Sequence, residues 1–123
     1  MKKPLEDLNM KTLFLSVIIS GISLFSLDSF AQAGKSIFDS KCVVCHTLGK
    51  GKLIGPDLKG VTQRRKADWV KKMIKDPENM LKTDETAKKL LQEYNNIPMI
   101  NMGLKDSEID AVIAYLKSED KKK

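Results

Sequence analysis

The chain contains two cysteines and one histidine, and all three lie in the pentapeptide Cys42-Val43-Val44-Cys45-His46. This C-x-x-C-H spacing is the signature of covalent haem attachment. The two thiols would add across the two haem vinyl groups as thioethers, and the imidazole that follows would bind iron from the same side. The motif therefore predicts one covalently attached haem c, with Cys42 and Cys45 as its attachment points and His46 as an iron ligand.

Three other uses of these residues fit less well. A disulfide between Cys42 and Cys45 would leave His46 without a role. A thioredoxin-like redox pair needs a strand before it and a helix after it, whereas residues 37–41 look helical and a glycine-rich loop follows the motif. A zinc site needs about four ligands, and two cysteines with one histidine leave it one short.

Haem iron has a second axial position, and the chain has no second histidine to fill it. A methionine in this position raises the reduction potential and suits electron transfer. Met73 lies in a helical pattern and Met80 follows a turn-like stretch, so both favour packing roles. Met99 follows Pro98, which keeps the segment extended, and a ligand that reaches iron from the far face would lie on such a loop. Spacing alone leaves Met102 as an alternative.

Helical periodicity dominates the rest of the chain. Apolar residues recur three and four positions apart over 69–74, 87–94 and 109–116, and a short first helix is expected over 34–40. Thr83 is the expected cap of the helix over 87–94. No run alternates in the manner of a strand. The pattern predicts an all-α domain of about four helices packed around one haem.

The amino end reads as a targeting segment. Lysines precede an apolar run over residues 13–27, and the small-x-small triplet Ala31-Gln32-Ala33 follows it. These features together predict a secretory signal peptide over residues 1–33 and hence export. An uncleaved membrane anchor is the alternative, although a bilayer-spanning helix takes about 20 apolar residues.

The charge pattern bears on the choice of partner. The formal net charge is +6, but the lysines are scattered among acidic residues and no nucleic-acid motif is present. This pattern argues against nucleic-acid binding and favours acidic protein partners. After the leader we expect one domain over residues 34–118 and a frayed, charged tail over 119–123.

The region after the leader resembles the bacterial class I monohaem cytochrome c family. The segment over 34–38 is similar to the family's first helix, in which glycine allows the last helix to cross closely. Gly55-Pro56-Asp57-Leu58 resembles the loop after the haem motif. The methionine loop and final helix are matched by Pro98-Met99, Gly103-Leu104, Glu108-Ile109 and Ala114-Tyr115-Leu116.

The resemblance implies roles for individual residues. Met99 takes the second axial position on iron, opposite His46. The backbone carbonyl of Pro56 accepts a hydrogen bond from the second ring nitrogen of His46 and so fixes the ring. Arg64, Arg65 and the indole N–H of Trp69 are the nearest donors for the haem propionates, a role that an Arg or a Trp often has in the family.

The function expected from this resemblance is single-electron transfer in the periplasm, without an enzymatic activity. The expected partners are a reductase and a terminal oxidase or reductase with acidic docking faces, with membrane contact only if the leader is retained. A fixed cytochrome subunit of a respiratory or dehydrogenase complex is the main alternative. An enzyme or gas sensor would need an iron site that neither Met99 nor Met102 closes.

Overall fold

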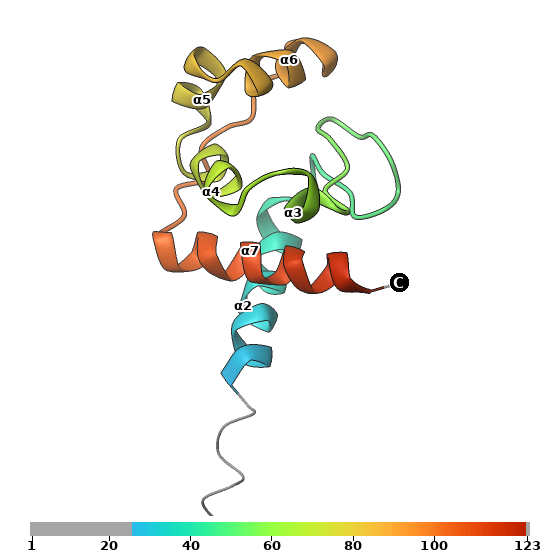
Figure 1. Cartoon of the computed structure of the whole chain (residues 1–123), viewed down its shortest axis with the longest axis vertical. Helices are drawn as coiled ribbons and strands as arrows, with labels where there is room; N and C mark the ends of the chain where they lie inside the picture. The colour runs from blue at the N-terminus through green and yellow to red at the C-terminus, as the bar shows by residue number, and fades with distance from the viewer. Residues whose placement is uncertain (1–25, 123) are drawn as a thin grey trace, which may run out of the picture.

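The computed structural model describes residues 26–122, and in this range the chain forms helices joined by loops, without a strand (Figure 1). The helices are α2 (Ser26–Lys41), α3 (Val61–Arg64), α4 (Ala67–Lys75), α5 (Pro77–Thr83), α6 (Glu85–Glu93) and α7 (Asp106–Lys121). The expected all-α fold is confirmed, with six helices in the described range where about four were expected. Residues 1–25 of the predicted leader lie outside the described residues.

The two long helices, α2 and α7, cross each other and form the base of the domain (Figure 1). Their backbones touch at Gly34, where a Cβ atom would lie 1.9 Å from the carbonyl oxygen of Ala111. Next to this point the rings of Phe38 and Tyr115 pack at a centroid distance of 5.5 Å. A side chain larger than hydrogen at position 34 would therefore force the helices apart.

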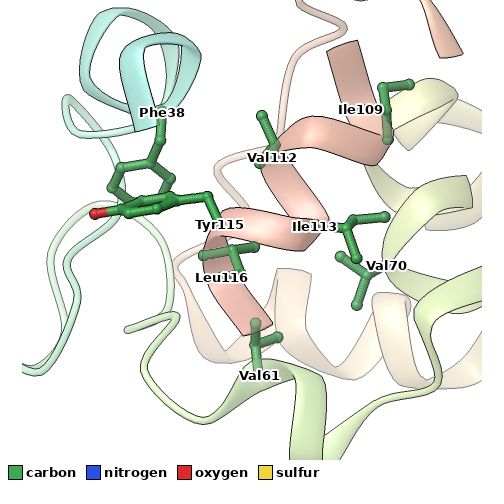
Figure 2. Packing of buried hydrophobic residues seen from close by; sticks show 8 residues of the cluster. All are labelled: Phe38, Val61, Val70, Ile109, Val112, Ile113, Tyr115 and Leu116. Carbon is green, nitrogen blue, oxygen red and sulfur yellow. The ribbon is translucent and has the colours of Figure 1, made fainter. Parts of the chain in front are cut away.

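One face of α7 supplies most of the hydrophobic core. Ile109, Val112 and Leu116 are at most 1% exposed, and Ile113 is 6% exposed. These are the positions that the helical periodicity of the sequence singles out. Val61 of α3 and Val70 of α4 pack against this face (Figure 2). Burial of a side chain of this size contributes about 1.5–3 kcal/mol, so this face of α7 is the main source of apolar stabilisation.

The segment over 76–84 differs from the sequence-based expectation. The turn-like stretch before Met80 is the start of α5: the Asp76 side chain accepts a hydrogen bond from the Asn79 amide, and Pro77 occupies the first turn. A capping carboxylate followed by proline is a helix start, because proline needs no amide partner there. Met80 is consequently buried in a helix, at 7% exposure.

The cap of α6 also differs by one residue. Asp84 occupies the N-cap, and its carboxylate accepts a hydrogen bond of 2.9 Å from the amide of Ala87. The expected cap, Thr83, instead donates its hydroxyl to the Asn79 carbonyl at 2.7 Å and closes the last turn of α5. The Thr83 prediction is wrong because the preceding helix uses this side chain.

The first and last of the described helices extend beyond their expected limits. α2 begins at Ser26 rather than at Gly34, and α7 continues to Lys121. The expected frayed tail is therefore wrong for residues 119–121. Asp120 accepts hydrogen bonds from the amide of Thr62, at 3.0 Å, and from its hydroxyl, at 2.7 Å, so this end of α7 is fastened to α3. Among the described helices none is long and apolar enough to cross a membrane.

Candidate functional site

The C-x-x-C-H motif forms one helical turn directly after α2. The Cys42 amide donates to the Phe38 carbonyl at 2.8 Å, and the His46 amide donates to the Cys42 carbonyl at 2.9 Å. Both thiols are free and partly buried. Burial, with a smaller effect from Cys45, raises the pKa of the Cys42 thiol to about 11. The turn thus presents two thiols and an imidazole from one short, hydrogen-bonded segment.

The His46 ring is held through its Nδ1 atom. This atom lies 2.9 Å from the backbone carbonyl oxygen of Pro56, which can only accept a hydrogen bond, so Nδ1 carries the proton. The other ring nitrogen, Nε2, makes no hydrogen bond with any described residue. Burial lowers the pKa of His46, with the Pro56 contact acting in the opposite direction. A neutral imidazole with a free Nε2 is the form that binds a metal ion.

Gly55 is a site residue that sequence reasoning missed. Its backbone lies so close to the His46 ring that a Cβ atom would stand 2.6 Å from Cε1 and 2.9 Å from Nδ1. Its amide also donates to the Cys45 carbonyl at 2.7 Å. The φ angle of Gly55 is not positive, so steric contact with the ring, rather than turn geometry, is the reason for glycine here. In the sequence, Gly55 stands next to Pro56 in the loop that resembles the family's loop after the haem motif, but no local signal predicts its contact with the ring.

Asp57 organises the loop that carries Gly55 and Pro56. Its carboxylate accepts hydrogen bonds from the amides of Gly49 (2.8 Å), Gly51 (2.7 Å) and Lys59 (2.8 Å). Desolvation would raise the pKa of Asp57, but these hydrogen bonds outweigh it and lower the pKa to about 2. One charged side chain therefore holds both arms of the loop beside the His46 ring.

The two candidate methionine ligands lie on a non-helical segment over residues 97–105, and both are partly buried. This segment begins after Asn95 and Asn96, whose φ angles of 60° and 57° end α6 with a left-handed turn. Between Met99 and Met102 the side-chain amide of Asn101 donates to the Lys75 carbonyl at 3.0 Å. The segment is thus attached to the carbonyl of the last residue of α4.

Arg65 and Trp69, the expected propionate donors, lie together. The guanidinium carbon of Arg65 is 5.5 Å from the Trp69 ring centroid, at the distance of a cation–π contact. The Trp69 side chain also lies beside the Asp84 carboxylate and helps to lower its pKa. The pKa of Asp84 is lowered first by the Ala87 amide and then by this contact. The two residues therefore also link α4 to the start of α6.

The segments around the motif expose apolar side chains. Val43 and Val44 of the motif, Leu53 and Ile54 of the following loop, and Ile97 and Ile100 beside Met99 are 42–68% exposed. Large apolar side chains exposed in and around a candidate site favour a bound ligand as their cover. A flat apolar macrocycle bonded to both thiols and to His46 Nε2 would supply it, so the residues present fit a covalently bound haem.

Comparison with known proteins agrees with this geometry. The cytochrome c family model matches residues 31–120. A "cytochrome c-553-like" protein of Synechocystis sp. is 36% identical over 64 residues, a match that spans 42% of this chain and 61% of that protein. The chain thus aligns with rather less than two thirds of this relative.

Solved structures extend the likeness to the fold. A cytochrome c from Rhodothermus marinus superposes with a TM-score of 0.73 at 31% identity, covering 76% of this chain and 78% of that one. The cytochrome c domain of a Pseudomonas putida protein gives a TM-score of 0.63 at 40% identity, covering 71% and 87%. With its helices, its C-x-x-C-H turn and its held histidine, the chain belongs to the cytochrome c family, as a class I monohaem member with covalently attached haem c, and Cys42 and Cys45 have the spacing of the attachment motif.

Proposed function

We propose that this protein is a periplasmic single-electron carrier whose one haem c is ligated by His46 and Met99. The observation that carries the proposal is the His46 ring, whose Nδ1 is held by the Pro56 carbonyl at 2.9 Å while Nε2 stays free. The haem supplies a one-electron couple at its iron. The chain positions a neutral imidazole on one side, and the hydrogen bond to Pro56 makes that imidazole a stronger donor.

Met99 is proposed as the second ligand because of its place in the chain. It stands on an extended segment after Pro98, and the resemblance to the family's methionine loop favours it over Met102. A thioether ligand stabilises reduced iron and so raises the reduction potential, which suits a carrier. Two protein ligands also leave no open iron position for a substrate, so we propose no enzymatic role.

We propose that acidic faces of a reductase and of a terminal oxidase or reductase are the partners. On α4, Lys71 and Lys75 are paired with Asp110 at 2.6 Å and Asp106 at 2.8 Å. In contrast, Lys41 and Lys50 beside the motif are exposed and have no ion pair within residues 26–122. Uncompensated positive charge next to the haem would steer acidic surfaces toward the electron-transfer edge.

The periplasmic location rests on the leader predicted over residues 1–33, and membrane contact is proposed only if that leader is retained. A fixed subunit of a respiratory or dehydrogenase complex would use the same haem residues. A large apolar patch that stayed exposed on the haem-loaded protein would favour this alternative, since a permanent partner would cover it. Co-purification of the protein with a larger complex at high salt would identify it as such a subunit.

The test is the optical spectrum of purified, exported protein. A haemochrome assay should report thioether-linked haem, and the ferric protein should show the weak far-red band of methionine ligation. Met99→Ala should abolish this band, while the matched variant Met102→Ala keeps it. The opposite pattern would assign the ligand to Met102. A wild type without the band that binds carbon monoxide when reduced would refute the closed site.

A further inference from the structure

Lys52 connects two segments that are far apart in the sequence. It lies on the loop over residues 47–60, which also holds Pro56 against His46. Its Nζ atom donates to the backbone carbonyl of Glu93 at 2.8 Å and lies 4.3 Å from the centroid of the Tyr94 ring. One ammonium group thus contacts the end of α6 in two independent ways.

The contacted end of α6 is where the methionine segment starts. The backbone amides of Tyr94, Asn96 and Ile97 donate to Leu90, Leu91 and Tyr94, so none of them satisfies the Glu93 carbonyl. Carbonyls in the last turn of a helix lack helical partners and carry partial negative charge. Lys52 supplies the missing donor and a positive charge at this position.

The chain around Met99 is consequently attached on both sides of that residue. On its far side, Asn101 donates to the Lys75 carbonyl of α4 at 3.0 Å. On its near side, Lys52 holds Glu93 and Tyr94, just before the left-handed turn at Asn95 and Asn96. Met99 lies between these two attachments.

We infer that Lys52 is a positioning residue, which joins the loop of the His46 side to the segment of the Met99 side and so keeps the methionine on the iron. The inference rests on the proposed ligation by Met99. Lys52 touches neither ligand. It acts by lowering the population of an open state in which the methionine segment has left the haem.

The size of the effect follows from the exposed position of these groups. A cation at an exposed helix C-terminus and a cation over a partly exposed aromatic ring each contribute modestly, and together they favour the closed state by about tenfold. An external ligand that binds only the open state has an apparent affinity proportional to the open fraction. Loss of Lys52 should therefore raise the affinity of the ferric protein for such a ligand by about tenfold.

The experiment titrates imidazole into the ferric haem-loaded protein and follows the far-red band. Lys52→Met removes the charge and keeps the aliphatic stem, Lys52→Arg keeps both charge and donor, and Lys50→Met removes a neighbouring charge that has no ion pair in the described residues. We expect about tenfold tighter imidazole binding for Lys52→Met and wild-type binding for Lys52→Arg and Lys50→Met. Tyr94→Leu should show part of the effect.

Other outcomes are equally informative. Equal imidazole affinities for Lys52→Met and Lys50→Met would overturn the inference, because the effect would then be one of net charge or absent. A lowered thermal midpoint with unchanged imidazole affinity would also overturn it, since Lys52 would then serve stability alone. If wild-type protein lacks the far-red band, the proposed Met99 ligation fails first, and this result is recognised before any Lys52 variant is measured.

Discussion

Replacement of Gly55 by alanine tests the steric basis of the His46 site. The new Cβ would lie 2.6 Å from Cε1 and 2.9 Å from Nδ1 of His46, whereas non-bonded carbon atoms rest at about 3.5–4.0 Å. The ring or the loop must therefore move by about 1 Å. A shift of this size would stretch the 2.9 Å contact between Nδ1 and the Pro56 carbonyl beyond hydrogen-bond length.

Two measurable losses follow from that shift. Overpacking costs about 1–3 kcal/mol and the lost hydrogen bond costs about 1 kcal/mol, so the free energy of unfolding should fall by about 2–4 kcal/mol. The hydrogen bond also makes the imidazole a stronger donor to oxidised iron. Without it the reduction potential should rise, by up to about 40 mV if the whole 1 kcal/mol is expressed in the one-electron couple.

The assays are denaturant unfolding and a spectroelectrochemical titration of the haem-loaded protein. The matched control is Gly49→Ala in the same loop, where φ is +85° and the nearest atom to a Cβ would be Lys59 Cγ at 3.9 Å. This variant should lose about 1–2 kcal/mol through backbone strain and keep the wild-type potential. Wild-type values of both stability and potential in Gly55→Ala would refute the steric argument.

Three further changes test other contacts. Gly34→Ala should lower the free energy of unfolding by about 2–3 kcal/mol or more, because the new Cβ would lie 1.9 Å from the Ala111 carbonyl oxygen. This loss is expected even though alanine favours a helix, and Ser36→Ala, at an exposed position of α2, is the control in denaturant unfolding. Asp57→Asn should lower the free energy of unfolding by about 1 kcal/mol near neutral pH, a modest value because the carboxylate is partly exposed. The folded pKa of Asp57 is about 2, below the ordinary 3.8, so the difference in stability from wild type should persist above about pH 4 and vanish as the pH falls toward 2. Acid unfolding curves of the two proteins would show this dependence. Asp120→Ala should lower the thermal midpoint and increase the rate of amide hydrogen exchange around Thr62, because it removes the acceptor of both Thr62 hydrogen bonds. An unchanged exchange rate there would show that Asp120 does not hold α7 against α3.

The fold class and the motif could be predicted because both are local. Cys42, Cys45 and His46 are near neighbours in the chain, so their spacing alone carries the chemistry. The apolar positions of α7 follow helical geometry, and Ile109, Val112 and Leu116 are indeed buried. One local signal failed because the same pattern suits two structures: Asp76-Pro77 begins a helix as readily as it forms a turn.

Contacts between distant parts of the chain were decided by the tertiary structure. The approach of Gly55 to the His46 ring depends on the path of a loop that Asp57 holds together. The Asp120–Thr62 contact joins residues 58 apart in the chain, and the Lys52–Glu93 contact joins residues 41 apart. Neither pair has a periodic or compositional signature, because a hydrogen bond of this kind depends on where two backbones meet in space. The sequence alone therefore predicted which side chains would bond the haem, and the packed chain determined how the His46 ring and the loops around it are held.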